Sequence, residues 1–273
     1  MPVRLLHVSD LHVGTPDDAS VRASLDALVS RLDPAVIVAS GDLTHRGRAA
    51  QHQRAASFLR AFGPPLVVVP GNHDIPYTFP GRFTRTFAEF RRWWETTEPV
   101  YASPDLHIVG LNSVRAWRKE SGGLHPTQLA TAVERLAGGA PGALRVAVLH
   151  HHLLGAPWRS RKKPVSRRSH VLASLVEGGA DLILAGHVHQ AAVGERREFE
   201  VSRRGERAAV VATAPGLGQP RPKRRGEARG LHAFDVESER IVARTFVWLD
   251  GDWGLTAVRE FARGGEPLVS GTA

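Results

Sequence analysis

The chain has 273 residues, of which 42% are hydrophobic and 23% charged, proportions typical of a globular protein with one large core. It contains no cysteine, which excludes disulfide bonds, zinc–thiolate sites and cysteine nucleophiles. The net charge of +9 suits an anionic partner such as nucleic acid, an anionic lipid surface or a phosphorylated substrate. An arginine-rich, lysine-poor composition is also typical of a GC-rich genome, so the charge has reduced weight as a functional signal.

The first part of the chain alternates short apolar strands with amphipathic helices. Short runs rich in β-branched residues predict three strands, and apolar residues at helical spacing predict the helices between them. The strands are expected at 3–8, 35–39 and 66–69, and the helices at 20–32 and around 55–62. This alternation predicts a parallel arrangement with right-handed crossovers.

The middle of the chain continues with mixed elements. An aromatic and basic segment, 79–94, has helical spacing and is expected to form a helix packed on the body. The segments 100–101 and 106–111 are typical of a hairpin. Further helices and strands are predicted at 126–136, 143–149, 168–176 and 181–185.

After residue 190 the pattern changes to strands without intervening helices. Period-two alternation predicts antiparallel strands at 193–201, 208–212, 231–236, 241–249 and 255–261. We find no interdomain linker, and expect a single domain over 1–263 followed by a frayed tail at 264–273. Neither a signal-peptide core nor an apolar run of membrane-spanning length is present, which predicts a cytoplasmic protein.

Polar side chains follow five of the predicted strands directly. In open α/β sheets, ligands bind at the carboxyl ends of the strands, so these side chains are expected at one rim. Each group alone is consistent with a turn or a packed histidine, whereas their joint occurrence predicts a metal site. The groups are Asp10 with His12, Asp42, Asn72 with His73 and Asp74, His150 to His152, and His187 with His189.

The set of donors indicates the kind of metal. Imidazole, carboxylate and amide donors suit Mn, Fe, Zn or Co, and are too rich in nitrogen for a dedicated Ca or Mg site. Seven donors exceed the three or four protein ligands of one catalytic ion. Two ions that share a bridging carboxylate would use all seven, and such pairs, about 3.5–4 Å apart, promote in-line displacement at phosphorus.

The order of these motifs resembles that of the calcineurin-like metallophosphoesterases. The resemblance spans residues 3–189 and is carried by Asp10-x-His12, Gly41-Asp42, Gly71-Asn72-His73-Asp74, His150 and Gly186-His187-x-His189. Gly41-Asp42-Leu43-Thr44 followed by Gly47, together with the chain length, resembles the bacterial class III cyclic-nucleotide phosphodiesterase branch. The fold that the resemblance implies is a four-layer α/β-β/α sandwich of two mixed sheets flanked by helices. It places the metal site in 1–190 and the antiparallel strands of 191–263 in the second sheet.

The resemblance also implies a division of roles among these residues. One metal would be held by Asp10, His12 and His189, the other by Asn72, His150 and His187, with Asp42 as the bridge. A hydroxide between the ions would attack the phosphorus. His73 would stabilise the phosphoryl oxygens and protonate the leaving alkoxide, and Asp74 would orient its ring.

Two departures from the family pattern leave alternatives open. The fourth motif usually has the sequence His-His-Pro, and here it is His150-His151-His152. His150 comes first after the strand and is the expected ligand, with His151 as the alternative ligand or a substrate contact. His45 stands where an acidic or amide residue is common, and it either faces the substrate or is solvated.

A cationic run, 158–168, follows the fourth motif with six basic residues and no acid. Its side chains, with Arg159 as the substrate-binding candidate, suit a substrate phosphate, a polynucleotide backbone or an anionic bilayer. A solvated loop is an equal alternative. The aromatic segment 79–94 is expected to be core, the alternative being a cap that stacks a base.

The leading interpretation is a binuclear phosphodiesterase that hydrolyses a cyclic nucleotide or another phosphodiester. The charge favours a nuclease as one alternative. Trp93, Trp94 and the cationic run favour a hydrolase of a nucleotide-linked lipid precursor as another. A non-catalytic scaffold is the least favoured, because a scaffold has no need of seven donors. The sequence leaves the oligomeric state open.

Overall fold

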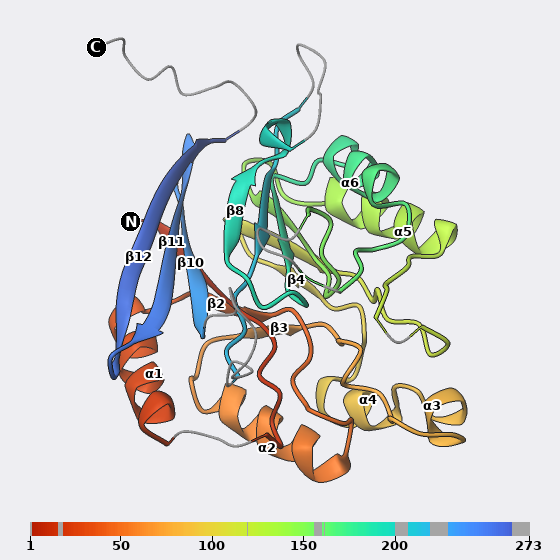
Figure 1. Ribbon diagram of the computed structural model, residues 1–273. Coiled ribbons are helices and arrows are strands. Elements are labelled where there is room, and N and C mark those ends of the chain that lie inside the picture. Colours follow the sequence, from red (N-terminus) through yellow and green to blue (C-terminus); the bar gives the residue numbers. More distant parts are fainter. Residues whose placement is uncertain are drawn as a thin grey trace.

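The computed structural model describes residues 2–15, 19–118, 120–155, 160, 162–199, 207–218 and 229–263. Two six-stranded sheets face each other, and helices cover their outer faces (Figure 1). The helices α1 (Ala19–Leu32) and α2 (Ala49–Arg60) lie on one side, and α5 (Pro126–Ala137) and α6 (Arg168–Glu177) on the other. This arrangement confirms the predicted four-layer sandwich.

The first sheet combines the beginning and the end of the described chain. Its strand order is β12-β11-β10-β1-β2-β3, with β1, β2 and β3 parallel and β10 antiparallel to β1. The strands are β1 Val3–Val8, β2 Val36–Ala39, β3 Leu66–Val68, β10 Gly230–Val236, β11 Arg240–Leu249 and β12 Asp252–Ala262. The parallel strands all end at the same edge, where polar residues follow each of them.

The second sheet has the order β4-β5-β6-β7-β9-β8. Its strands are β4 Val100–Ala102, β5 Leu106–Gly110, β6 Leu144–Val148, β7 Leu182–Ala185, β8 Ala192–Glu195 and β9 Val210–Thr213. The strands β5, β6, β7 and β9 are parallel, while β4 and β8 pair antiparallel at the two edges. The predicted hairpin of β4 and β5 is therefore present.

The strands after residue 190 do not all belong to the second sheet, so that prediction is wrong. Only β8 and β9 join it, and β9 runs parallel to β7, whereas β10, β11 and β12 extend the first sheet. The expected strand 193–201 ends at Glu195, and a short 3-10 helix, Arg196–Glu198, follows it. Alternation of apolar residues reports which side chains are buried and does not identify the partner strand.

The aromatic segment forms two short helices in place of the single predicted helix. These are α3 (Gly81–Thr84) and α4 (Ala88–Trp94). Near the break, the hydroxyls of Thr84 and Thr86 donate to the carbonyls of Pro80 and Arg82, a contact that competes with regular helical bonding. None of the described helices is long and apolar enough to cross a membrane.

The space between the sheets is filled by apolar side chains from both. Leu5, Val38, Val146 and Leu184 belong to this layer and are almost completely buried. The intervening residues of the same strands, such as Ile37, face the outer helices. Because both faces are occupied by apolar packing, polar side chains are confined largely to the strand ends.

Candidate metal centre

The polar groups predicted from the sequence meet at one edge of the sandwich. The loops after β1, β2 and β3 of the first sheet converge there with the loops after β6 and β7 of the second. Three groups of histidines and acids place their ligand atoms within 4.8 Å of one another. They are Asp10, His12 and His189; Asp42, His150 and His187; and His12, His45 and His73.

The backbone at this edge is strained and closely packed. Five of the predicted donors have φ values between 47° and 76°, which non-glycine residues rarely adopt: Asp10, His12, Asp42, His187 and His189. A Cβ atom on Gly71 would lie 2.1 Å from the backbone nitrogen of Asp42, and one on Gly186 would lie 1.9 Å from Ser9 Oγ. The glycines of the motifs therefore let the loops approach closely enough to bring the donors together.

The first cluster combines one carboxylate with two imidazoles. His189 Nε2 lies 3.0 Å from Asp10 Oδ1 and 3.1 Å from His12 Nε2. The other carboxylate oxygen, Asp10 Oδ2, accepts hydrogen bonds from the Ser9 hydroxyl at 2.7 Å and the His187 amide at 2.9 Å. These two bonds fix the carboxylate and direct Oδ1 towards the histidines.

The second cluster has its donors oriented in the same way. His150 Nε2 lies 3.4 Å from Asp42 Oδ2, 3.2 Å from Asn72 Oδ1 and 3.2 Å from His187 Nδ1. The opposite ring nitrogens of His150 and His187 face the carbonyls of Ser40 at 2.9 Å and Glu120 at 3.0 Å. A ring nitrogen that donates to a carbonyl leaves the other nitrogen with a free lone pair, as in protein metal sites.

Asp42 lies between the two clusters. Its Oδ2 is 3.4 Å from His150 Nε2 in the second cluster and 3.8 Å from His12 Nε2 in the first. Its Oδ1 accepts the backbone N–H of His73 at 2.8 Å. Within the described residues it is the carboxylate with an oxygen close to donors of both clusters.

The buried carboxylate oxygens test whether a cation fits. Asp10 Oδ1 and Asp42 Oδ2 are both buried without a hydrogen-bond partner, which is unfavourable for a charged group unless a cation compensates it. Ligands about 2.0–2.2 Å from one ion lie about 3.0–3.5 Å apart. The observed separations of 3.0–3.4 Å between nearest donors are close to this range. The residues therefore fit divalent transition-metal ions.

The ionisation of these groups is consistent with a cation site. Burial opposes the charge of Asp10, but the His189 and His12 imidazoles outweigh it and hold its pKa well below the usual value. Burial also opposes the charge of Asp42, and His150 and His73 hold its pKa low. Burial likewise lowers the pKa of His150, but Asp42 raises it to about 9. Without a metal, a proton on His150 takes the place of a cation.

His73 lies at the open side of the centre. Its half-buried ring packs edge-on against His12 at 4.9 Å and lies nearly parallel to the ring of His45 at 5.9 Å. Its Nδ1 faces the carbonyl of His45 at 2.8 Å. The ring is thus oriented by a backbone carbonyl, and His45, for which the sequence left two alternatives open, lies beside it at the site.

Asp74 does not orient the His73 ring, so that part of the prediction is wrong. Its carboxylate accepts the backbone amides of Gly71, Leu43 and Thr44 and the hydroxyl of Thr44, at 2.8–3.2 Å. These contacts join the loop after β2 to the loop after β3. A loop carboxylate that bonds nearby amides is a structural role that a sequence motif alone does not distinguish from a catalytic one.

The three consecutive histidines have three different environments. His150 points into the second cluster, while His151 Nδ1 lies 2.8 Å from the hydroxyl of Ser113. His151 is buried behind the cluster, with its ring 4.7 Å from that of His187, and is not positioned to meet substrate. His152 is also buried and stacks on His187. Arg159, the third substrate-binding candidate, lies outside the described residues.

The structure adds contacts that the motifs did not specify. Lys162, one of the six cations of the basic run, is buried and places Nζ 3.4 Å from His189 Nε2. The amides of Leu217 and Gly218 donate to the carbonyls of Ser9 and Asp10 and hold the first motif. The cationic run 158–168 indicated in the sequence that a basic side chain could reach the site. The contacts of Leu217 and Gly218 join segments far apart in the sequence, and no local pattern predicts them.

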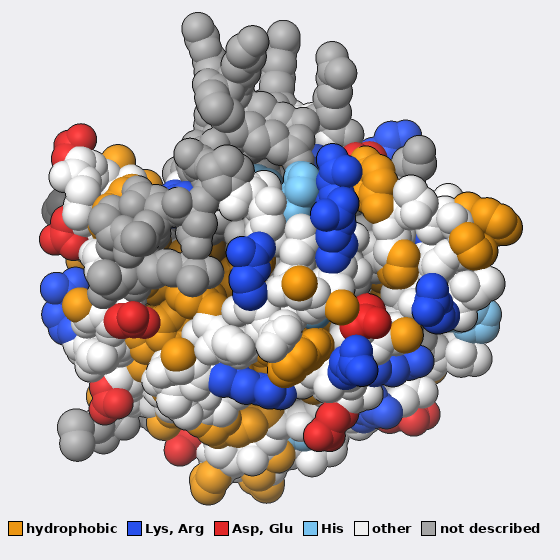
Figure 2. Space-filling model, turned by 90° about the horizontal axis from the view of Figure 1, so that it is seen from below, with side chains coloured by type: hydrophobic (Ala, Val, Ile, Leu, Met, Phe, Trp, Pro, Cys, Tyr) orange, Lys and Arg blue, Asp and Glu red, His pale blue; other side chains and the backbone are white. Residues whose placement is uncertain are grey.

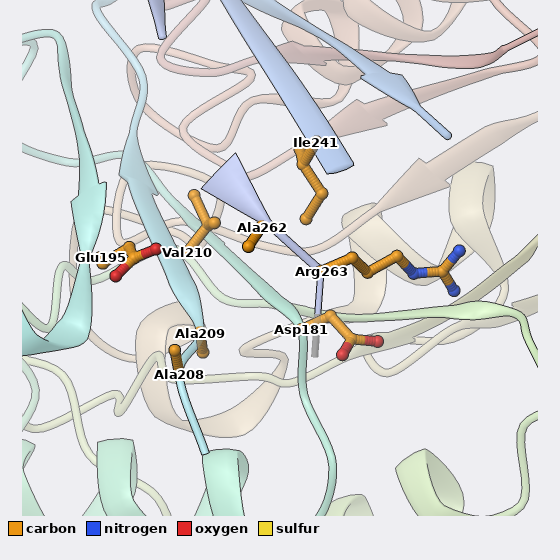
Figure 3. A pocket seen from close by; sticks show the side chains of 8 residues that line it. All are labelled: Asp181, Glu195, Ala208, Ala209, Val210, Ile241, Ala262 and Arg263. Carbon is orange, nitrogen blue, oxygen red and sulfur yellow. The ribbon is translucent and has the colours of Figure 1, made fainter. Parts of the chain in front are cut away.

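A narrow cavity lies at the opposite end of the second sheet from the metal centre. It is lined by Asp181, Glu195, Ala208, Ala209, Val210, Ile241, Ala262 and Arg263, which come from both sheets (Figure 3). Asp181 precedes β7, so the cavity is at the amino end of the strand that carries His187 at its carboxyl end. None of the described metal-binding clusters includes a residue of this cavity.

Comparisons with known proteins agree with this geometry. The family model described as calcineurin-like phosphoesterase matches residues 3–191. The 3',5'-cyclic adenosine monophosphate phosphodiesterase CpdA of Haemophilus influenzae is 27% identical over 219 residues, which cover 73% of this chain and 74% of that protein.

Two solved structures share the fold at low sequence identity. A dimetal phosphatase of Danio rerio is 14% identical, with a TM-score of 0.64 over 97% of this chain and 100% of that one. The purple acid phosphatase PPD1 of yellow lupin is 13% identical, with a TM-score of 0.70 over 97% of this chain and 54% of that one. The sandwich of two sheets is therefore found in phosphatases of distant sequence.

Proposed function

Since the chain belongs to the calcineurin-like phosphoesterase family and is a metal-dependent phosphoester hydrolase, we propose that it is a binuclear phosphodiesterase. Its substrate would be a cyclic nucleotide or another small phosphodiester. The observation that carries the proposal is the pair of buried carboxylate oxygens, Asp10 Oδ1 and Asp42 Oδ2, that lack hydrogen-bond partners and face imidazole nitrogens.

The two clusters divide the seven donors between two ions. One ion would be held by Asp10, His12 and His189, the other by Asn72, His150 and His187, and Asp42 would bridge them. When bound, Mn, Fe, Zn or Co ions would polarise the phosphoryl oxygens and supply an activated water as nucleophile. His150 is favoured over His151 as the ligand, because His151 is turned towards Ser113.

His73 is assigned the proton transfer to the leaving oxygen. Its Nδ1 is engaged by the His45 carbonyl, which leaves Nε2 as the atom that can exchange a proton with substrate. The half-buried ring adjoins the first cluster through His12 without being part of the proposed ligand set. The carbonyl of His45 therefore has the positioning role that the sequence suggested for Asp74.

Lys162 is assigned to the substrate phosphate. In the structure its Nζ lies 3.4 Å from His189 Nε2, the nitrogen that would bind the first ion. The ammonium then requires another acceptor, and the oxygens of a bound phosphate are suitable. This contact uses one of the six cations of 158–168, so at least part of that run serves the active site.

The similarity to CpdA supports a cyclic nucleotide as the substrate class. A nuclease remains an alternative that the net charge alone favours. Trp93 and Trp94 do not favour a lipid-linked substrate. Both rings are partly buried and lie beneath the guanidinium of Arg60, and the ring of Trp94 also packs against the core of the first sheet. The complete donor set argues against a non-catalytic scaffold. Cytoplasmic localisation stays a prediction.

A hydrolysis panel tests the proposal. Mn-loaded protein is assayed with bis(p-nitrophenyl) phosphate, cyclic nucleotides, single-stranded DNA and a nucleotide-linked lipid. We expect hydrolysis of the first two classes and much less of the others. Efficient cleavage of DNA or of the lipid would reassign the substrate, and a metal-loaded protein inactive on all four would contradict the phosphodiesterase.

A further inference from the structure

Exposed aromatic side chains gather on two loops that lead out of the metal centre. Tyr77, Phe79, Phe83 and Trp117, which we call the aromatic edge, are between 54% and 80% exposed. These four are all but one of the strongly exposed aromatic side chains among the described residues, the other being Phe199. Single exposed apolar side chains are normal, whereas a group of large ones marks an interaction surface.

The aromatic edge is built on two loops joined by one buried arginine. The guanidinium of Arg82 donates to the carbonyls of Ala116 at 2.7 Å, Arg118 at 3.0 Å and Pro76 at 3.3 Å. It therefore fastens the turn at α3, which carries three of the aromatic residues, to the loop that carries Trp117. In Figure 1 this loop and α3 lie next to each other at the periphery, away from the sheet junction.

Both loops continue directly into the metal centre. One leaves the site at His73 and reaches Tyr77 four residues later, where the guanidinium of Arg46 lies 5.5 Å from the tyrosine ring. The other passes Trp117 and returns to the site at Glu120, whose carbonyl faces His187. A surface that engages the aromatic edge would thus place the metal centre close to that surface.

The segments that carry the aromatic edge contain more basic than acidic side chains, although the exposed Glu120 follows the second of them. The segments 75–87 and 112–118 contain four arginines and no acidic residue. Among the described residues the exposed Arg46 and Arg85 form no ion pair, and they supply the accessible positive charge, whereas Arg82 and Arg118 are bound within the loops. Figure 2 shows basic, hydrophobic and some acidic side chains interspersed on the face seen from below. The occupant of this edge is therefore expected to be anionic.

We propose that the aromatic edge attaches the protein peripherally to an anionic lipid surface, with the metal centre held near it. Aromatic side chains enter the interfacial region of a bilayer, and nearby arginines attract anionic headgroups. Since no described helix can span a membrane, the attachment would be interfacial and reversible. The proposal rests on the exposure and charge of the edge and is independent of which ester is hydrolysed.

Two other occupants fit the observations less well. A second copy related by twofold symmetry would bring two positively charged edges together, which is unfavourable. A single-stranded nucleic acid needs a track of free cations for its phosphates. Here Arg82 is buried among carbonyls, and Arg118 is bound to Gly122 and Ser166, so few free donors remain.

Vesicle co-sedimentation of the full chain tests the proposal. We expect binding to phosphatidylglycerol-containing vesicles that weakens with salt, and little binding to pure phosphatidylcholine vesicles. The double variant Phe79→Ser/Phe83→Ser should lower the partition coefficient roughly tenfold or more. The matched control is Leu255→Ser/Val258→Ser on β12, where two apolar side chains are similarly exposed at 51% and 50%. This control should bind as the wild type does.

Four results would overturn the proposal. The first is an absence of binding to the anionic vesicles at low salt. The second is an equal loss of binding in both double variants. The third is self-association of the wild type that disappears in Phe79→Ser/Phe83→Ser without vesicle binding. The last is an oligothymidylate that binds through the same two phenylalanines in preference to vesicles. Unchanged thermal melting of both double variants confirms that folding is intact.

Discussion

The two ends of β7 show how differently the fold treats a buried acid. At the amino end, Asp181 accepts the backbone amide of Arg145 at 2.9 Å and forms an ion pair with Arg207. At the carboxyl end, Asp10 and Asp42 each keep one buried oxygen without a hydrogen-bond partner. Both ends lie in well-packed regions, and a cavity is present at the amino end (Figure 3). An unsatisfied carboxylate oxygen that also faces imidazole nitrogens, and not burial or a cavity alone, therefore marks the site for a cation.

The largest expected effect tests this contrast directly. Asp42→Asn keeps the shape of the side chain and removes the charge that both clusters share. We expect loss of both metal ions and a fall in hydrolysis of bis(p-nitrophenyl) phosphate of about 10⁴-fold or more. Asp181→Asn is the control, since it should lower thermal stability and leave metal content unchanged. If both variants retained full metal, the contrast between the two ends would be meaningless.

The next effect separates proton transfer from metal binding. His73→Ala should retain metal and lose about 10²–10⁴-fold in turnover of a cyclic nucleotide, whose alkoxide leaving group needs a proton. The loss should be smaller with a p-nitrophenyl ester, because p-nitrophenolate leaves as a stable anion. An equal deficit on both substrates would contradict the general-acid role and favour electrostatic stabilisation. Loss of metal would show that His73 is a ligand.

A smaller effect is expected from Lys162→Met, which keeps the length of the side chain and removes its charge. Substrate binding should weaken by about tenfold, seen as a higher KM, because one charge-assisted contact to the phosphate is lost. Metal content should stay at the wild-type level. The neighbouring variant Lys163→Met is the control, since Lys163 is exposed. Equal effects of the two variants would reduce the role of Lys162 to general surface charge.

The smallest expected effect concerns Asp74. In Asp74→Asn an amide N–H₂ would face backbone amides that now donate to a carboxylate. Stability should fall by about 1–3 kcal/mol, while the ratio of activities on the two ester types should stay unchanged. Chemical denaturation measures the fall in stability, and kinetic assays on a cyclic nucleotide and on a p-nitrophenyl ester give the ratio of activities. A variant that reproduced the substrate dependence of His73→Ala would restore a link between Asp74 and that ring.

The sequence predicted those features that depend on local pattern. The parallel strands and the position of the donors at their ends follow from short apolar runs, whereas the four-layer sandwich was implied by the family resemblance that the ordered motifs carry. Partner choice among later strands did not follow, because β9 and β10 are both buried along their whole length and yet join different sheets. The roles of Asp74 and Ser113 were also inaccessible, since each depends on contacts between residues distant in sequence, and the cationic run did not single out Lys162 among its six members.

The most direct test of the central claim is elemental analysis of three proteins purified without chelator and then supplied with Mn. We predict about two equivalents of transition metal per chain in the wild type and in His151→Ala, and about one or fewer in His150→Ala. His151→Ala is the matched control because it removes an adjacent buried imidazole. A wild type that cannot be raised above one equivalent, or a loss of metal in His151→Ala but not in His150→Ala, would contradict the two-cluster assignment.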